Sequence, residues 1–370
     1  MVQERGGAVN PARLPFPLQD LANITLDSCT QIRVKINSSP LLWPLGEAQI
    51  QIVNNDDFNA FAHHRQGCEG IGIYLGTFER LTKLSIALWS EEGLLSNARV
   101  GWRANEVLQD YVGACELEHW RTLHKSILSE EHLAQRRMNT ALTSLCYVFM
   151  HEVGHLVRAH IPFLSKRASC EIATLYERGN TSLPCSNTEL QFFEIDADVH
   201  AVEAVTDFAL TTWAKGRIFP VNFAYPKGDL FSYLVDFYRG VCMAMFCLDC
   251  GSTSRRLASR SNHPVAAVRL GIACLASMRL LDHPFQIPQK TAFAACVAAS
   301  MEVGDLFTRK GFSALTLEND LILMLEKSAE MMKRSEFYLD GKQSAIDERL
   351  QSMGRDPRHF DQYRDFYKRK

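Results

Sequence analysis

The sequence lacks an excess of charge of either sign. Its 370 residues include 40 Lys and Arg against 42 Asp and Glu, which leaves a formal net charge of −2. Proteins that bind nucleic acid or an anionic membrane surface through electrostatics usually carry a basic patch or a strong positive balance. We therefore expect neither nucleic acid nor a membrane among the partners of this chain.

Long uninterrupted hydrophobic runs are also lacking. The N-terminal residues, MVQERGGAVNPARLPFPLQD, contain no apolar core typical of a secretory signal. The two most apolar later stretches are residues 230–250 and 265–281, and both contain charges that are costly at membrane depth, namely Asp236, Arg239, Asp249, Arg269 and Arg279. We expect these stretches to form buried helices, and the protein to be cytoplasmic.

The cysteines do not form the pattern of a disulfide framework. There are 11, an odd number at irregular spacings, and a chain of this length can build a core without cross-links. Cys247 and Cys250 form a CxxC pair without a second pair, which favours buried thiols over a zinc knuckle. We expect reduced, mostly buried thiols.

The pattern of apolar residues predicts an α+β fold. Alternating apolar and polar residues favour strands over 24–38 and 48–53, and a third strand is expected over 71–76. The chain from about 80 to 285 has helical spacing, broken by a loop from about 162 to 186. We thus predict an N-terminal sheet followed by a mostly helical C-terminal half. The expected organisation is an N-terminal extension at 1–23, a catalytic domain at 24–285 and a helical C-terminal extension at 286–370.

One motif carries a specific chemistry, the sequence HEVGH from His151 to His155. Two His at i and i+4 lie on the same face of a helix and can bind one zinc ion, and the intervening Glu152 can act as general base toward water. A catalytic zinc takes three protein ligands, so a third ligand is needed. The metzincin pattern would place Gly at 158 and His at 161, but these positions hold Arg158 and Ile161, with His160 one residue out of register.

Glu194 is the candidate third ligand. It opens the sequence EIDAD at 194–198, again with helical spacing, so that Glu194 and Asp198 share one helix face. Asp198 could accept the second ring N–H of a zinc-binding His and fix its orientation. An exposed acidic helix face is the alternative, but the surrounding residues are largely apolar, and buried carboxylates need partners: Phe192, Phe193, Ala197, Ala201 and Val205.

With these motifs in place, the chain resembles the gluzincin metallopeptidases of the HtpX and CAAX prenyl protease family. The resemblance rests on NAFA at 59–62, IGIYLGTFERL from residue 71, HEVGH, EIDAD, and NHPVAAVRL, which contains His263 and Arg269. These motifs occur in the family's order between residues 48 and 270. The transmembrane helices of that family are missing, however, and a soluble relative with an HExxH helix is the Lit-type phage-exclusion peptidase.

The resemblance implies a zincin-like catalytic domain that binds Zn²⁺ through His151, His155 and Glu194. It also implies that His263 donates a hydrogen bond to the developing oxyanion, that Arg269 anchors the structure nearby, and that an extended peptide adds to a sheet edge near Asn59.

The expected function is that of a zinc endopeptidase that cleaves a cytoplasmic protein substrate, with water activated by zinc and Glu152. One alternative is a catalytically silent zinc-binding sensor or regulatory protein, although Glu152 argues against it because a structural site has no use for this carboxylate. The other alternative is a membrane-associated protease.

Overall fold

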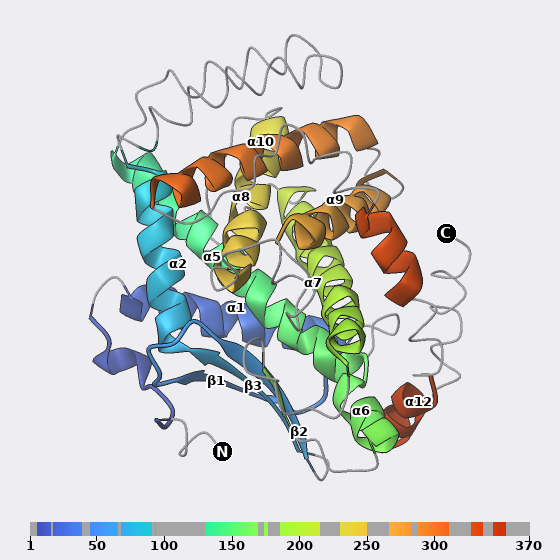
Figure 1. Ribbon diagram of the computed structural model, residues 1–370. Helices are drawn as coiled ribbons and strands as arrows, with labels where there is room; N and C mark the ends of the chain where they lie inside the picture. The colour runs from blue at the N-terminus through green and yellow to red at the C-terminus, as the bar shows by residue number, and fades with distance from the viewer. Residues whose placement is uncertain are drawn as a thin grey trace. The chain divides into compact units, whose positions relative to one another are not determined.

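The computed structural model describes residues 6–15, 18–38, 45–65, 68–90, 93, 130–168, 174–176, 186–214, 230–249, 266–282, 287–310, 327–335 and 343–352 (Figure 1). The chain forms two compact units. The first comprises Met1–Thr77, Val148–Ala201 and Met331–Lys370, and the second comprises Phe78–Tyr147 and Val202–Glu330. The fold is α+β, with a small sheet in the first unit and mostly helical structure elsewhere, which confirms the predicted class.

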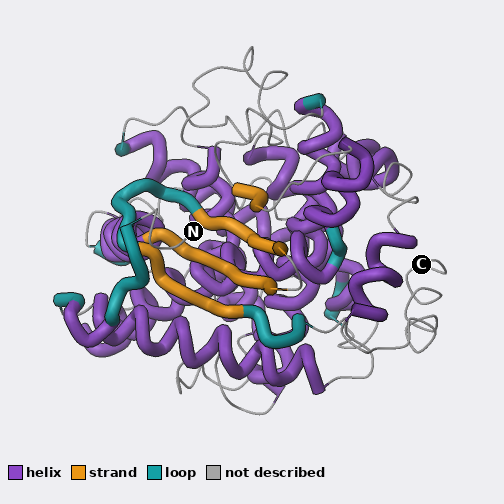
Figure 2. The backbone as a smooth tube through the Cα atoms, turned by 90° about the horizontal axis from the view of Figure 1, so that it is seen from below, coloured by secondary structure: helices purple, strands orange, loops and turns teal. Residues whose placement is uncertain are grey.

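The sheet of the first unit has four strands in the order β1-β3-β2-β4. These are β1 (Gln49–Val53), β2 (Ala60–Arg65), β3 (Cys68–Tyr74) and β4 (Thr174–Tyr176), drawn in orange in Figure 2. β1 pairs with β3 in parallel, and β2 pairs with both β3 and β4 in antiparallel fashion. The sheet is therefore mixed. The predicted strands at 48–53 and 71–76 are confirmed, except that the second ends at Tyr74 and a helix follows.

The prediction of a strand over 24–38 is wrong, because these residues belong to helix α1 (Leu18–Ser38). The buried residues of α1 recur with helical spacing, namely Leu21, Ala22, Thr25, Ser28, Cys29, Ile32 and Ile36. The alternation of apolar and polar residues that suggested a strand thus belongs to a helix with one buried face. Side-chain hydrogen bonds fix α1 to the start of β1, since Arg33 Nη1 donates to the carbonyl of Ala48 over 2.8 Å.

A strand glycine shapes the core of the sheet. A Cβ atom at Gly72 would lie 2.3 Å from the ring of Phe61, so only glycine leaves room for that ring across the β2–β3 pair. Phe61 is 1% exposed and meets Tyr74 edge to face, with 6.1 Å between the ring centroids. Gly72 of β3 therefore serves packing.

A buried ion pair joins the sheet to the C-terminal helix α12 (Gln343–Ser352). Arg349 donates from Nε and Nη2 to the two carboxylate oxygens of Glu69, each over 2.7 Å, and His64 Nδ1 lies 3.1 Å from the same carboxylate. Burial alone would raise the pKa of Glu69, but the contacts with His64 and Arg349 outweigh it and lower the pKa below the usual 4.5. The pair is bidentate, the geometry that an arginine fork suits best.

Replacing Arg349 with methionine is expected to destabilise the protein by about 3–5 kcal/mol at neutral pH, because Glu69 is left as an unpaired buried charge. Since folding lowers the pKa of Glu69, the contribution of the pair is present above about pH 4.5 and is lost as the pH falls through the folded-state pKa. The difference in unfolding free energy between wild type and Arg349→Met should therefore shrink on acidification. Denaturant titrations at neutral and acidic pH measure it.

The double variant Glu69→Gln with Arg349→Met is the matched control, because it removes both charges and should recover part of the lost stability. If Arg349→Met alone lowered the free energy of unfolding by less than about 1 kcal/mol, the pair would behave as an exposed surface ion pair and not as a buried one.

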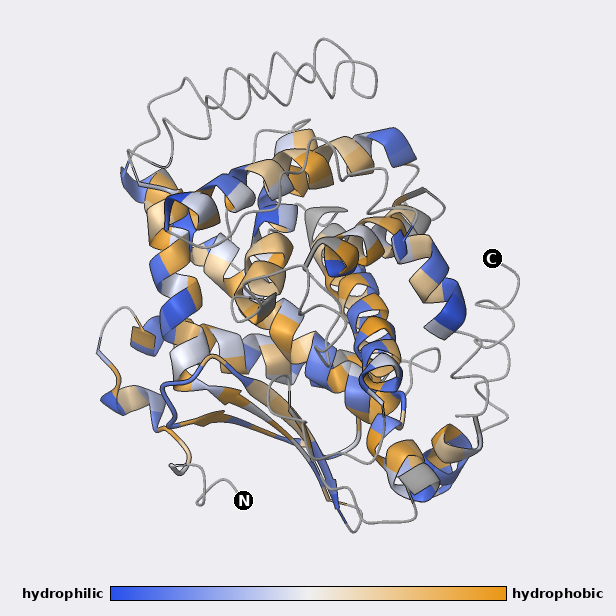
Figure 3. Cartoon of the chain, viewed as in Figure 1, coloured by the Kyte–Doolittle hydropathy of each residue, from blue (hydrophilic) through white to orange (hydrophobic). Residues whose placement is uncertain are grey.

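The second unit contains α2 (Leu75–Leu88) from Phe78 onward, α8 (Leu230–Asp249), α9 (Ala266–Asp282) and α10 (Gln289–Arg309). Helices α8 and α9 confirm the two helices expected from the most apolar stretches. By length and composition, residues Leu230–Leu248 and Gln289–Arg309 could cross a membrane, but 94% and 78% of their most apolar windows are buried inside the structure. Figure 3 shows hydrophobic residues in orange along much of α10. Such burial is what the core helices of a globular unit show.

The charged residues of these apolar helices pair with one another. Arg239 of α8 donates from Nε to Glu302 of α10 over 2.5 Å, and Arg136 donates to Asp236 over 2.5 Å. Burial opposes the charge of Arg239, yet Glu302 and Asp236 raise the pKa of the guanidinium above its ordinary value. The charges of α8 therefore form part of a paired internal network.

Candidate metal centre

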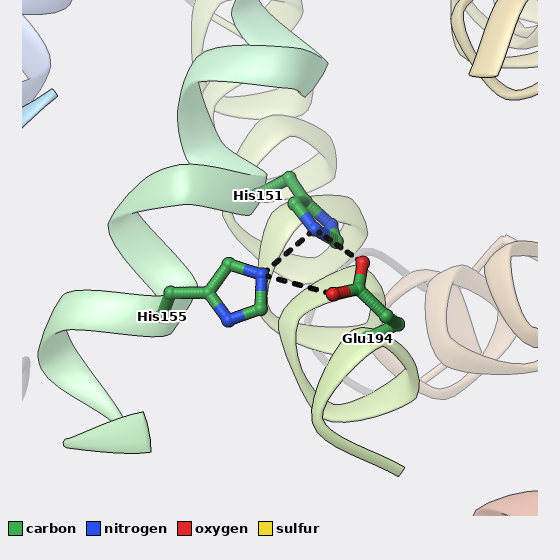
Figure 4. Close-up of side chains that lie close together, drawn as sticks. All are labelled: His151, His155 and Glu194. Atoms are coloured by element: carbon green, nitrogen blue, oxygen red, sulfur yellow. Dashed lines mark hydrogen bonds and ion pairs between the residues drawn. The ribbon is translucent and has the colours of Figure 1, made fainter. Parts of the chain in front are cut away.

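The HEVGH motif lies near the end of helix α5 (Glu130–Val157), as predicted. From Asn139 to Val157 every side chain of α5 is buried, so the motif sits in a helix segment enclosed on all sides. His151 is 0% exposed and His155 is 2% exposed. Their spacing of four residues places both rings on one face of α5 (Figure 4).

The EIDAD motif lies on helix α7 (Asn187–Ala214), whose start is fixed by a capping box. Ser186 Oγ accepts a hydrogen bond from the backbone N–H of Glu189 over 3.2 Å, and the Glu189 carboxylate accepts from the N–H of Ser186 over 2.8 Å. Because α7 begins there, Glu194 and Asp198 lie one turn apart on the same face of the helix. Glu194 is 3% exposed and Asp198 is fully buried.

Gly154 allows α5 and α7 to approach each other closely. A Cβ atom at Gly154 would lie 3.0 Å from the Cα atom of Ala197 and 3.3 Å from its Cβ atom, which is tighter than ordinary side-chain contact. Both residues belong to the two motifs, Gly154 to HEVGH and Ala197 to EIDAD. Two small residues at the crossing bring Glu194 within reach of the two His.

The donor atoms of His151, His155 and Glu194 converge on one point (Figure 4). His151 Nε2 lies 3.1 Å from His155 Nε2 and 3.2 Å from Glu194 Oε2, and His155 Nε2 lies 3.6 Å from Glu194 Oε1. Ligands about 2.0–2.2 Å from a tetrahedral zinc lie roughly 3.3–3.6 Å from one another. The three residues are therefore spaced as three ligands of one metal ion.

The second ring nitrogen of each His is engaged elsewhere. His151 Nδ1 lies 2.9 Å from Asp198 Oδ1, the contact predicted for Asp198. His155 Nδ1 lies 2.9 Å from Nδ1 of His160, whose Nε2 lies 2.8 Å from Asp196 Oδ2. In both His151 and His155, Nδ1 thus contacts a neighbouring side chain, and Nε2 faces the point where the donor atoms converge.

The environment favours the protonation state that binds metal. Burial is the main cause that lowers the pKa of His155 well below its usual value, and the nearby His151 and His160 lower it further against the opposing effect of Glu194 and Asp198. His155 is therefore neutral near pH 7, and a neutral imidazole is the form that coordinates a metal ion.

The donor set fits zinc. Two imidazole nitrogens with one carboxylate oxygen form the combination found in catalytic zinc sites that keep a position open, whereas Mg²⁺ and Ca²⁺ prefer oxygen ligands alone. Among the described residues, His151, His155 and Glu194 are the group of His, Cys, Asp and Glu side chains that could hold a metal ion.

The other predicted site residues have different settings. Glu152 is 1% exposed and follows His151 on α5. Arg269 is 1% exposed on α9, in the second unit, while the three candidate metal ligands belong to the first. His263 lies outside the described residues.

Asn59 directly precedes β2 and is tied into the sheet by its backbone. Its N–H donates to Thr77 Oγ1 over 3.0 Å, and its carbonyl accepts from both the Thr77 hydroxyl and the N–H of Tyr74. The main-chain groups of Asn59 are thus already used inside the first unit. Its side-chain Oδ1 accepts from the N–H of Ala60 over 3.0 Å.

His160 and Asp196 are site residues that sequence reasoning missed as such. His160 was considered only as a zinc ligand out of register, and the Asp between Glu194 and Asp198 was given no role. The sequence predicted a loop from 162 to 186, but α6 (His160–Ala168) continues the helical structure through Pro162. A helix that restarts directly after α5 brings its first residue back to His155.

Comparison with known proteins identifies no relative. No family model matches the chain, and no curated protein and no solved structure is significantly similar to it.

Proposed function

We propose that this protein is a zinc-dependent endopeptidase of gluzincin type, with His151, His155 and Glu194 as metal ligands and Glu152 as general base. The observation that carries the proposal is the convergence of three buried donor atoms from HEVGH and EIDAD, with Glu152 between the two His. A structural zinc site usually closes all four positions with protein ligands. Three ligands and an additional buried carboxylate favour catalysis over a silent sensor.

The chemistry divides among a few residues. When bound, zinc would act as a Lewis acid that polarises the scissile carbonyl and the attacking water. Glu152 takes the proton of that water and later delivers it to the leaving amine. Asp198 holds His151 through its Nδ1. The resemblance to the gluzincins would assign His263 the role of hydrogen-bond donor to the oxyanion and Arg269 that of a structural anchor, and both roles remain part of the proposal.

The proposed substrate is a protein segment in extended conformation. A peptide added to a sheet is held by main-chain hydrogen bonds, while side-chain pockets set its specificity. The sheet lies in the same unit as the candidate metal centre, and among the described residues β4 pairs with β2 from Phe61 to His63, two residues after Asn59. We propose the surroundings of Asn59, at this end of β2, as the place of peptide contact.

We place the activity in the cytoplasm. Six of the seven described cysteines are buried, which agrees with the thiols expected of a protein from a reducing compartment. A membrane-associated protease is the second candidate, because two helices are long and apolar enough to span a bilayer. Their burial favours the first candidate. Fractionation of cells without detergent separates the two, since a membrane protease would sediment with the membranes.

Mapping of new protein N-termini tests the proposal in cells. Cells that express the wild type should contain one or a few N-termini that are missing from cells expressing Glu152→Ala at the same level. Each such terminus identifies a substrate and its cleavage site. Identical sets of termini in the two cultures, together with full zinc occupancy of both proteins, would favour the silent zinc-binding regulator instead.

A further inference from the structure

His160 is held in place by a tight turn between two helices. Helix α5 ends at Val157, and Ala159 adopts a φ of 56°, the only described non-glycine residue with positive φ. A left-handed residue commonly ends a helix, but glycine is the usual choice because a Cβ atom adds strain there. Ala159 is fully buried, and its carbonyl accepts from the N–H of Phe163 over 3.0 Å as α6 begins. The turn thus brings His160 into contact with His155 of α5.

The hydrogen bonds around His160 form a chain that ends at the metal centre. Asp196 Oδ2 lies 2.8 Å from His160 Nε2, and His160 Nδ1 lies 2.9 Å from His155 Nδ1. His155 Nε2 in turn lies 3.1 Å from His151 Nε2, at the point where the donor atoms converge. His160 is fully buried, and its ring meets that of Phe193 edge to face at 5.0 Å between centroids. The ring of His160 therefore has little freedom to turn.

The chain of contacts sets the tautomer of each ring. An ionised carboxylate only accepts hydrogen bonds, so His160 carries its proton on Nε2 and donates to Asp196. A neutral imidazole with a proton on Nε2 accepts at Nδ1, so His155 must donate from its own Nδ1. The lone pair of His155 then lies on Nε2, the nitrogen that faces Glu194 and His151.

We propose that His160 and Asp196 are positioning residues that hold His155 in the orientation and tautomer required for metal binding. Asp198 contacts His151 directly, whereas Asp196 acts on His155 through the imidazole of His160. The inference rests on the metal centre of the proposed function and not on peptide hydrolysis. Each metal-binding His would thus have its own carboxylate, Asp198 directly and Asp196 through His160.

Metal affinity measures the contribution of this chain directly. His160→Phe keeps a ring of similar volume but cannot accept from His155, so zinc affinity should fall by about 10–100-fold, the usual effect of an outer-shell partner. Competition with a chromophoric chelator gives the affinity of the purified protein. Asp198→Ala, which removes the partner of His151 Nδ1, is the comparison, and its zinc affinity should fall by a similar factor. Phe163→Leu, on α6 and packed on Phe193, is the control for a general loosening of α6 and should bind like wild type.

A conservative variant and a double variant separate positioning from packing. His160→Asn places an acceptor oxygen near the position of Nδ1 and should return the affinity to within about threefold of wild type. Asp196→Ala should weaken zinc binding in the wild-type background but have little further effect in His160→Phe, because the two residues act in series. In the Co²⁺-loaded protein, His160→Phe should also change the visible absorption bands, which report ligand geometry.

The outcomes distinguish this inference from the proposed function. If the wild type binds zinc tightly and His160→Phe binds it equally well, or if the effects of the two substitutions simply add, His160 and Asp196 have no positioning role. If His160→Phe weakens zinc binding but no peptide hydrolysis is found in the wild type, the positioning role holds and the peptidase does not. A wild type that binds no zinc overturns both.

Discussion

Glu152→Gln should leave the protein folded and loaded with zinc but nearly without peptidase activity. The amide has almost the shape of the carboxylate, and Glu152 is not among the three converging ligands, so metal affinity and thermal stability should remain at wild-type values. The amide cannot accept a proton from water, and the loss of a general base typically costs about 10²–10⁴-fold in turnover. The measurement is the rate of cleavage of a peptide that spans a site found by N-terminus mapping.

Glu152→Asp is the matched variant, because it keeps the carboxylate but withdraws it by one methylene group. It should retain zinc and show activity between those of wild type and Glu152→Gln, since a displaced base still accepts a proton with poorer geometry. Normal turnover by Glu152→Gln, in protein shown to be free of wild type, would falsify the assignment of the general base. Equal and complete inactivity of wild type and both variants would instead support a silent zinc-binding protein.

The helices that carry the candidate metal ligands could be predicted from the sequence because their signals are local. HEVGH lies in a segment without proline, and spacing alone puts His151 and His155 on one face. The capping box of Ser186 and Glu189 and the spacing of Glu194 and Asp198 are equally local. Spacing alone does not show that the two helices meet. That follows from the close contact of Gly154 with Ala197, which depends on the tertiary structure.

The N-terminal part was predicted less well because its signals are ambiguous. The alternation of apolar and polar residues over 24–38 suggested a strand, yet the residues buried in α1 recur with helical spacing. Strand β2 was not predicted, because AFAHHR shows no alternation and its pairing depends on β3 and β4. Edge pairings between distant segments, such as that of His63 with Thr174, leave no local pattern in the sequence.

The series of hydrogen bonds from Asp196 through His160 to His155 could not be predicted from motif spacing. A motif specifies only the positions of ligands, and the metzincin pattern requires a His at position 161, so His160 does not match it. Its contact with His155 depends on the left-handed conformation of Ala159, which is unusual for alanine and is imposed by the surrounding structure. His160, which is out of register for the metzincin pattern, thus lies beside the candidate ligand His155.

Glu194→Ala should abolish stoichiometric zinc binding. With two protein ligands left, the loss of affinity should exceed the roughly 10–100-fold effect expected of an outer-shell residue such as Asp198 or His160. Glu194→Gln keeps the volume and removes the charge, so a similar loss in that variant would exclude a cavity as the cause. Metal analysis after dialysis, with zinc per chain as the readout, is the direct measurement.

Glu203→Ala is the control, because Glu203 lies on the same helix α7, is 8% exposed and is not among the three converging ligands. This variant should keep the wild-type zinc content even if its stability falls. The opposite pattern, with full zinc in Glu194→Ala and none in Glu203→Ala, would show that the third ligand lies two and a half turns further along α7. In that case Glu194 and the two His would form an ion-pair cluster, and the third metal ligand would be Glu203.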